Sequence, residues 1–451
     1  MKKTTSLLVL IISVVSSVVF SAHAVTRELA GDWRNFLTTT LHSLECMRQN
    51  GSLLVDRVQL LSSHSPCPLI VLHAPTSPTN IAFDLLVQLH RLNLTQVEKI
   101  VSDLVKLPYH IPSGLFYNRY QSKNGKSFTV IEPRVSSIDN LHLKIALWAV
   151  GQVVPSSQKL IQSLLLRMNL STFYDFQDGL FYGLWNNGLE KWKYSYWGSE
   201  ARSLYALSFA FSWVDDPEML PKVFASSTIE VATLRMGAKN KKLQLLRTWD
   251  GGAFQLLLPH LLFNEGEFSP PLLQLLKNYV PFIISEGERR SLSLPAGHSA
   301  SEAFGGYSGK LGNLALVATS NQDQFDTSLR ASWESVVTPH ALFLAALLDA
   351  PKMLPWIQAA TTLKDYDQRT LYHPQLGMMD GYIVAGSGLH QILQLQLSLD
   401  QTIIALSLFQ LLDPHHHSLI YQLLLKKENA KIYERLQRFY RYFKVQTIPY
   451  K

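Results

Sequence analysis

The chain has 451 residues, of which 47% are hydrophobic and 17% charged, a composition ordinary for a globular protein with a large core. Its net charge of +7 is diffuse, and no run of Arg and Lys accompanies a readable nucleic-acid motif, so we expect no nucleic-acid partner. Only Cys46 and Cys67 occur, too few for a thiolate metal site. In an oxidising compartment they would close a loop and add about 3 kcal/mol of stability, but the sequence leaves this disulfide open.

The first residues are typical of a secretory signal. Lys2 and Lys3 precede an apolar run over residues 7–20, and "SAHA" ends at Ala24 with small residues at the spacing of a cleavage site. The run is too short to favour a membrane-spanning helix, and no cysteine directly follows the site for a lipid anchor. We therefore expect removal of residues 1–24 and a periplasmic or secreted protein without a stable membrane anchor.

Most of the remaining chain is predicted to be helical. Apolar residues recur at helical spacing, often after a Ser, Thr or Asp, in the segments 79–93, 138–152, 199–213, 338–351 and 399–412. Residues 114–132 differ, because two alternating stretches flank Asn124 and Gly125, a strong signal for a small β-hairpin. No linker rich in Gly, Ser or Pro divides the chain, so residues 25–451 are predicted to form one helical toroid.

The C-terminal segment, from about residue 426, mixes Lys and Arg with Tyr and Phe. One interpretation is a helix that binds a membrane surface or a partner protein. The favoured interpretation is a terminal helix that packs its aromatic rings on the domain and turns its basic face to solvent. Histidines 415–417 have no spaced carboxylate or further histidine beside them, and we predict no metal or cofactor for this protein.

Acidic residues recur beside aromatic or apolar runs, at helix starts or in turns rich in Gly and Ser. Each by itself is explained as a helix cap, a turn carboxylate or part of a solvated face. Together they indicate a carbohydrate site, because aromatic rings cover the apolar faces of sugars and glycosidic cleavage commonly uses two carboxyl groups. These acids are Asp139, Glu200, Asp250, Glu302, Asp380 and Asp400.

Glu200 has two local interpretations. In the first, Ser199 caps the following helix, and Glu200 in its first turn favours the positive end of the helix dipole, worth about 0.3–1 kcal/mol. In the second, Glu200 lies directly behind Tyr196 and Trp197 on the wall of an aromatic sugar site. A hydrophobic wall would raise the pKa of its carboxyl group and suit a proton donor. The local sequence favours the cap.

Several motifs keep their order over roughly residues 50–412: "TSPTNIAFDLL", "GLFYNRYQ", "SSIDNLHL", "YWGSEARSL", "TWDGGAFQLLLP", "HSASEAF", "VVTPHALFLAAL" and "LSLDQTIIAL". This ordered set resembles the glucoamylase-like family, which includes a domain of cyclic β-1,2-glucan synthases and stand-alone bacterial β-1,2-glucanases. The resemblance implies an all-α fold, an (α/α)6 barrel with a cleft at one end.

The resemblance also implies site residues. Glu200 and Glu302 occupy positions of the family's catalytic carboxylates, with Glu200 as acid/base and Glu302 as nucleophile or base, although the order stays open. Asp139 matches an acid that lies in the family's glucan site. The other residues that we assign to substrate binding are Tyr196, Trp197, Arg202, Trp249, Asp250, Gln255, His340, Asp380, Asp400 and Gln401.

The chain departs from the family in three places. Gln255 stands where the family motif has a Glu, His340 where it has a Tyr, and residues 377–380 read "GMMD" where the synthases carry an aromatic residue. The glycosyltransferase and phosphorylase-like regions of the synthases are also missing. We therefore expect a chain that cuts or rearranges a glucan and does not make one.

The leading hypothesis is an exported glycoside hydrolase that cleaves a β-glucan, with β-1,2-linked glucose as the first choice of substrate. A transglycosylase that uses the same carboxylates is the first alternative. A glycan-binding protein that keeps the cleft without turnover is the second, and a helical scaffold whose acids are only caps is the least favoured. Whether cleavage retains or inverts the configuration at the anomeric carbon depends on the separation of the two carboxyl groups and stays open. The oligomeric state stays open as well.

Overall fold

The computed structural model describes most of the chain between residues 30 and 443. Residues 1–29, which contain the predicted signal, lie outside the described residues, and so do Glu302 and the predicted hairpin turn at Asn124 and Gly125. The described ranges are 30–48, 51–60, 67–73, 75–123, 127–190, 192–236, 241–299, 314–319, 333–385 and 390–443.

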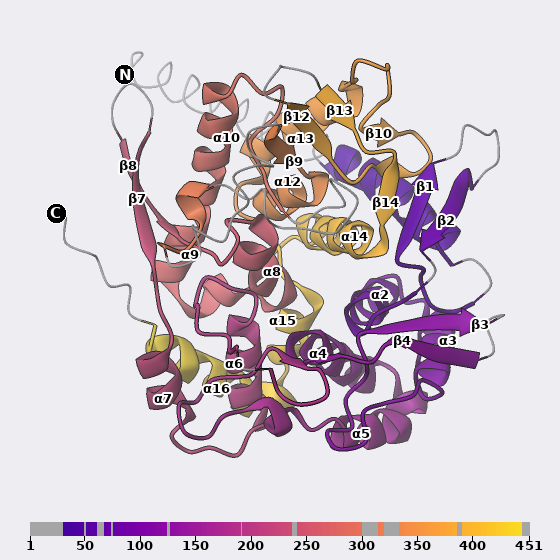
Figure 1. The fold of residues 1–451 in the computed structure, drawn as a ribbon, viewed down its shortest axis with the longest axis vertical. Helices are drawn as coiled ribbons and strands as arrows, with labels where there is room; N and C mark the ends of the chain where they lie inside the picture. Colours follow the sequence, from indigo (N-terminus) through magenta and orange to yellow (C-terminus); the bar gives the residue numbers. More distant parts are fainter. Residues whose placement is uncertain are drawn as a thin grey trace, which may run out of the picture.

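Six helices of the described chain form an inner ring: α2 (Pro78–His90), α4 (Ser137–Val153), α6 (Arg202–Phe211), α8 (Ala253–Phe263), α12 (Pro339–Ala346) and α14 (Ser398–Leu412). Neighbours touch in the order α2, α4, α6, and then α8, α12, α14 and back to α2 (Figure 1). The Arg202 guanidinium of α6 joins the two groups by donating to the backbone carbonyl of Gln255 in α8 at 3.1 Å. Nearly every side chain of α8 and α12 is buried, because these helices are packed on all sides.

An outer layer of helices covers this ring: the helix of residues 30–46, α3 (Leu94–Leu104), α5 (Gln158–Arg167), α7 (Met219–Ser226), α9 (Pro270–Lys277), α10 (Tyr279–Arg289), α13 (Ala350–Thr362), α15 (Leu419–Leu424) and α16 (Ala430–Arg441). Among them, α3 packs on α2, α5 on α4, α7 and α16 on α6, α15 on α8, and α10 and α13 on α12. Inner and outer helices therefore alternate along most of the chain, as the sequence predicts for a helical toroid. Short 3-10 helices occupy Pro155–Ser157, Leu170–Phe173, Glu265–Phe268, Leu314–Leu316 and Lys427–Asn429.

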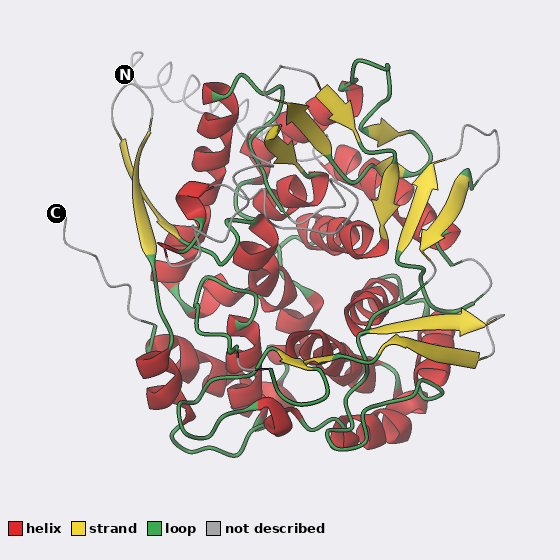
Figure 2. Ribbon diagram, viewed as in Figure 1, coloured by secondary structure: helices red, strands yellow, loops and turns green. Residues whose placement is uncertain are grey.

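Short antiparallel strands connect the helices (Figure 2). The predicted hairpin is present as β3 (Arg119–Lys123) and β4 (Ser127–Glu132), with Gln121 opposite Thr129. Two three-stranded sheets have the orders β14-β1-β2 and β13-β12-β9, and the other pairs are β5-β6, β7-β8 and β10-β11. Their bounds are β1 (Arg57–Leu60), β2 (Leu69–His73), β5 (Val135–Ser136), β6 (Leu184–Trp185), β7 (Val231–Met236), β8 (Lys241–Leu246), β9 (Trp333–Val337), β10 (Tyr372–His373), β11 (Gly377–Met378), β12 (Tyr382–Ala385), β13 (His390–Ile392) and β14 (Leu395–Leu397).

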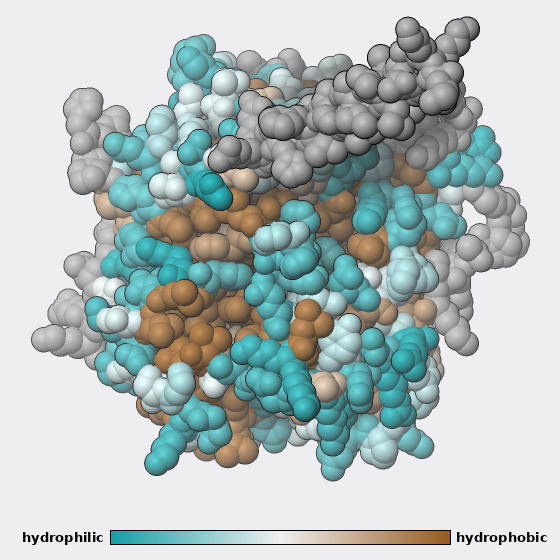
Figure 3. Space-filling model, turned by 180° about the vertical axis from the view of Figure 1, so that it is seen from behind, coloured by the Kyte–Doolittle hydropathy of each residue, from teal (hydrophilic) through white to brown (hydrophobic). Residues whose placement is uncertain are grey.

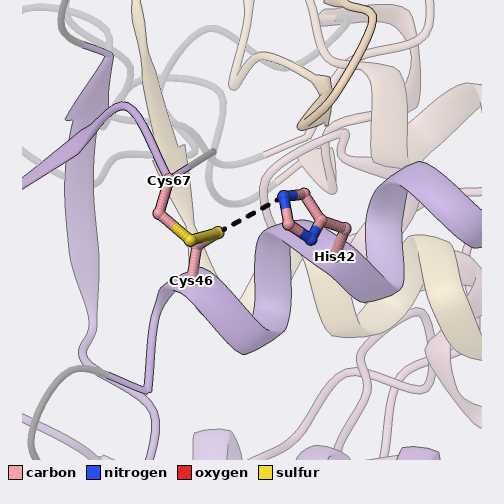
Figure 4. A group of neighbouring side chains, drawn as sticks. All are labelled: His42, Cys46 and Cys67. Carbon is pink, nitrogen blue, oxygen red and sulfur yellow. Dashed lines mark hydrogen bonds between the residues drawn. A yellow bond between two sulfur atoms is a disulfide. The ribbon is translucent and has the colours of Figure 1, made fainter. Parts of the chain in front are cut away.

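Cys46 and Cys67 form a disulfide, which the sequence left open. It ties the end of the helix of residues 30–46 to the segment before β2, and the two Cα atoms are 5.4 Å apart (Figure 4). The Nε2 atom of His42 lies 3.7 Å from the Cys46 sulfur. This is the one group of His, Cys, Asp and Glu side chains with metal-ligating spacing among the described residues. Because its two sulfur atoms are bonded to each other, they are not thiolate ligands.

The C-terminal helix α16 packs its apolar side against α6. Phe439 is fully buried there, and its ring stacks on that of Trp197 with 5.6 Å between the centroids. Lys431, Arg438 and Arg441 are exposed on the other side of the helix. The terminal helix thus packs its aromatic rings on the domain and turns its basic side chains to solvent, as the favoured interpretation of the sequence predicts.

The face opposite that of Figure 1 shows apolar side chains between hydrophilic ones (Figure 3). Exposed apolar residues of this kind are common on globular proteins. None of the described helices combines the length and the apolar character that a membrane crossing requires.

Candidate active site

The N-terminal ends of the inner helices meet at one end of the barrel. The first turns of α2 and α4 bring Asn80 and Asp139 to a shared cavity, which Phe254 of α8 and Leu399 of α14 also line. Glu200 joins them from the turn that precedes α6. Helix N-termini present unpaired N–H groups and a positive dipole end, so acidic side chains are stabilised there. The acids that precede separate helices in the sequence thus become neighbours in space.

Two cavities adjoin at this end, and Glu200 lines both of them. The polar cavity, of about 350 Å³, is lined by Asp56, Pro75, Thr76, Ser77, Thr79, Asn80, Asn118, Arg119, Glu132, Arg134, Asp139, Glu200, Phe254, Leu397 and Leu399. The aromatic cavity, of about 550 Å³, is lined by Trp192, Lys193, Tyr194, Ser195, Tyr196, Ser199, Glu200, Trp249 and Gln255. The carboxyl-bearing residue Glu200 therefore stands at the boundary between a hydrophilic and an aromatic compartment.

Glu200 is held by the side chain of Gln255. The Oε1 atom of Gln255 accepts the backbone N–H of Glu200 at 3.1 Å and the hydroxyl of Ser199 at 2.9 Å. Its Nε2 atom donates to the Glu200 carboxyl oxygen Oε1 at 3.3 Å. Ser199 also accepts the N–H of Ala201, but α6 begins only at Arg202. Glu200 therefore precedes the helix, and its carboxyl group faces the cavities.

Burial raises the pKa of Glu200 to about 8. The negative charges of Asp139 and Asp250 also contribute to this shift, whereas the hydrogen bond from Gln255 opposes it. A carboxyl group with this pKa carries its proton at neutral pH. Such a group can protonate a leaving oxygen, as a general acid must.

Asp139 lies in the first turn of α4 and faces the polar cavity. Its carboxylate accepts the hydroxyl of Thr79 at 2.6 Å, and its backbone N–H donates to Ser136, the cap of α4. Burial raises the pKa of Asp139, and the hydrogen bonds from Thr79 and Ser136 oppose this shift. The helix start thus fixes the carboxylate in the same cavity as Glu200.

Trp249 and Asp250 are adjacent in sequence but face different surroundings. Trp249 is 47% exposed and lines the aromatic cavity, as Tyr196 does. Asp250 is buried, and its carboxylate accepts the N–H of Gly252 at 2.7 Å. Burial raises the pKa of Asp250 to about 6, although the hydrogen bond from Gly252 favours the charged form and opposes this shift. Of the two, only the tryptophan ring is available to a ligand in these cavities.

Two residues assigned to substrate binding, Trp197 and Arg202, line neither cavity. Trp197 is buried against Phe439 of α16. The Arg202 guanidinium is fully buried and donates to the carboxylate of Glu265 at 2.8 Å and to the backbone carbonyl of Ser199 at 3.0 Å. Because a buried charge needs a partner, the Arg202 guanidinium pairs with Glu265. Its hydrogen bond to Ser199 supports the turn that carries Glu200.

The remaining assigned residues are buried: His340 at the start of α12, Asp400 and Gln401 at the start of α14, and Asp380 between β11 and β12. The Nδ1 atom of His340 lies 3.1 Å from Oδ2 of Asp400, and Gln401 donates to the backbone carbonyl of Met378 at 2.8 Å. Burial lowers the pKa of His340 to about 4, although the charge of Asp380 opposes this. None of these side chains is among the lining residues of either cavity.

Sequence reasoning missed the hairpin side of the polar cavity. There Arg119 of β3 lies 3.3 Å from Glu132 of β4 and 3.5 Å from Asp56, and Asn80 donates to Asp56 at 3.0 Å. Arg119 falls inside the matched motif "FYNRYQ", so its motif position was the available signal. Trp192 was also missed, although "WKYSYW" places aromatic residues at alternate positions.

No protein-family model and no curated protein matches the sequence. Solved structures do match. A variant of endo-β-1,2-glucanase from Talaromyces funiculosus in complex with β-1,2-glucan is 12% identical over 93% of this chain and 92% of its own, with a TM-score of 0.67. Endo-β-1,2-glucanase from Chitinophaga pinensis, with sophorotriose and glucose, is 13% identical over 91% and 98%, with a TM-score of 0.63.

A third structure, the β-1,2-glucanase from Parabacteroides distasonis, is 13% identical over 92% of this chain and 60% of its own, also with a TM-score of 0.63. The chain has the fold of the β-1,2-glucanases. The predicted (α/α)6 barrel and the resemblance to glucoamylase-like proteins are thereby confirmed at the level of the fold. In this chain, residues from the starts of α2, α4, α8 and α14 line the polar cavity, and residues from the segment 192–200 line most of the aromatic cavity.

Proposed function

We propose that this protein is a glycoside hydrolase that cleaves a β-glucan, with β-1,2-linked glucose as its substrate. One observation carries the proposal: the carboxyl group with a pKa of about 8, Glu200, stands where the polar and the aromatic cavities adjoin. A glycosidic bond placed over Glu200 would have one part of the sugar chain in each cavity. Glu200 would then donate its proton to the leaving oxygen as the bond breaks.

The polar cavity suits the hydroxyl groups of a sugar. Thr76, Ser77, Asn80 and Asn118 line it, together with charged groups of the hairpin. The aromatic cavity suits the apolar faces of sugar rings, because two half-exposed indole rings and two partly buried tyrosines line it. A chain that crosses both compartments matches cleavage inside a polymer.

The second carboxyl group is proposed from the sequence. Glu302, as nucleophile or base, lies outside the described residues, and its role stays a prediction. Asp139 shares the polar cavity with Glu200 and is proposed to bind substrate hydroxyls while its charge keeps Glu200 protonated.

Export is proposed as well. The disulfide between Cys46 and Cys67 supports it, because disulfides persist in oxidising compartments such as the periplasm or the extracellular space.

The test is product analysis of the protein with linear β-1,2-glucan. Shorter glucan chains should appear with the unmutated protein and should be lost in Glu200→Gln and in Glu302→Gln. Glu218→Gln is the matched control, since that side chain is 72% exposed and lines neither cavity. Rearranged chains without net hydrolysis would establish a transglycosylase, and binding without turnover a glycan-binding protein. Undiminished cleavage by Glu200→Gln would overturn the proposal.

A further inference from the structure

Trp192 is an exposed aromatic residue in the aromatic cavity. The residue is 46% exposed, comparable to Trp249 on the same cavity, which is 47% exposed. Leaving an indole of this size in contact with water forgoes the stabilisation that its burial would bring. Two half-exposed indoles in one cavity are therefore a feature that core packing does not explain.

The Trp192 ring is nevertheless fixed in orientation. Its Nε1–H donates to the carboxylate of Glu190 at 2.7 Å. The ring of Tyr194 meets it edge-on, with the centroids 5.1 Å apart and an angle of 88° between the planes. These two contacts hold the polar edge and one side of the indole.

Gly183 supplies the third contact, directly beneath the ring. A Cβ atom added at Gly183 would lie 1.7 Å from Cη2 and 2.0 Å from Cζ3 of Trp192, so the indole occupies the space that any side chain at this position would need. The backbone joins the same two residues, because the N–H of Gly183 points at the carbonyl of Trp192 at 3.4 Å. The glycine is thus a seat for the benzene half of the indole.

A fixed, half-exposed indole is suited to one kind of ligand. The C–H groups on the face of a pyranose ring pack on a flat aromatic surface, and a ring that is already oriented loses little conformational entropy when the sugar binds. Lys193, next in the chain, is tied to Asp175 and Asp178 at 2.6 Å each, so its ammonium group is neutralised within the protein. The wall therefore favours a neutral sugar over an anionic one.

We propose that Trp192, seated on Gly183, is a preformed stacking platform for a glucosyl unit on the aromatic side of Glu200. This inference rests on the proposed function and deepens it, because the platform makes the length of glucan that the protein binds depend on Trp192. A substrate too short to reach from Glu200 to the platform gains nothing from it.

The experiment measures glucan affinity separately from turnover. Calorimetric titration of linear β-1,2-glucan is carried out in a Glu200→Gln background, which keeps both cavities but lacks the carboxylic acid. Trp192→Ala should weaken binding about tenfold, a change typical of one lost aromatic contact. Gly183→Ala should weaken it similarly, because the added methyl group displaces the ring from its seat. In the presence of Trp192→Ala, Gly183→Ala should have no further effect, as a double-mutant cycle would show.

Two control variants match these changes. Tyr366→Ala removes an aromatic ring that is 60% exposed and lines neither cavity, and Gly31→Ala adds a methyl group with nothing within 4 Å. Both should bind glucan as the background does. In the active protein, Trp192→Ala should raise KM more for long glucan than for the shortest cleaved oligosaccharide.

The outcomes separate the platform from the proposed function. If the Glu200→Gln background binds glucan and Trp192→Ala binds it equally well, the platform is overturned and the glycosidase proposal stands. If the background binds no β-1,2-glucan and the active protein cleaves none, both are overturned. If Gly183→Ala still weakens glucan binding when the Trp192 ring is absent, Gly183 does not act by supporting that ring. The lost affinity would then come from a change in the backbone.

Discussion

Replacing Gln255 by Glu would place a second acid against Glu200. The orientation of the Gln255 amide follows from its partners, because the backbone N–H of Glu200 can only donate and must therefore meet Oε1. The Nε2 group then faces the Glu200 carboxyl oxygen at 3.3 Å. In Gln255→Glu, a carboxyl oxygen would occupy the place of that nitrogen, and the two groups would share one proton.

The size of the effect follows from the separation. Two unit charges 3.3 Å apart repel by about 5 kcal/mol at an effective dielectric constant of about 20, which corresponds to roughly four pKa units. Water in the adjoining cavities screens part of this repulsion. We therefore expect the upper ionisation of the pair to lie at least about one unit above the pKa of about 8 that Glu200 has in the unmutated protein.

The assay is the pH dependence of kcat for cleavage of β-1,2-glucan. A general acid is active while protonated, so the alkaline limb of the profile should move to higher pH in Gln255→Glu. Carbon-13 NMR of the labelled glutamate carboxyl groups would report the same shift without turnover. Gln274→Glu, on the outer helix α9 and outside both cavities, is the control and should leave the profile unchanged. An alkaline limb that stays in place or moves to lower pH would refute the reasoning.

Four further predictions concern Asp139, Glu200, Arg202 and the disulfide. Asp139→Asn should move the alkaline limb of the kcat profile to lower pH, because the Asp139 charge raises the pKa of Glu200; a shift to higher pH would contradict this. Since folding raises the pKa of Glu200, its contribution to stability is complete below the unfolded value of about 4.3 and is lost as pH rises to about 8. Glu200→Gln should therefore unfold at a higher temperature than the unmutated protein at pH 9 but not at pH 4. Arg202→Met should cost about 3–5 kcal/mol in urea unfolding by leaving Glu265 charged and buried, and an unchanged midpoint would exclude the pair as a structural support. Reduction of the disulfide should cost about 3 kcal/mol, whereas identical unfolding curves with and without reductant would contradict that value.

Local sequence determined the elements of this fold well. The segments 138–152 and 399–412 correspond to α4 and α14 within two residues, because helical spacing of apolar residues and a preceding Ser are properties of the chain alone. The hairpin of β3 and β4 followed from alternation around a two-residue turn signal for the same reason. The prediction of one helix over residues 338–351 was less complete. In the structure α12 ends at Ala346, and Asp349 caps a further helix, α13.

Tertiary structure decided which side chains face the cavities. Trp197 and Trp249 both stand beside acids in the sequence, yet Trp197 is buried and Trp249 is half exposed. The difference comes from α16, whose Phe439 packs on Trp197 from 242 positions further along the chain. No local pattern carries that information, because the partner is chosen by the closing of the whole ring.

The partners of charged and polar side chains were likewise decided by the tertiary structure. Arg202 begins an apolar helix and has the sequence appearance of a ligand contact, but Glu265, 63 residues later, neutralises it. Gln255 reaches Glu200 across 55 residues. The sequence determined that acids stand at the starts of helices. The packing of the ring determined that Glu200 lies between two cavities with a raised pKa, since burial and neighbouring charge are properties of the assembled structure.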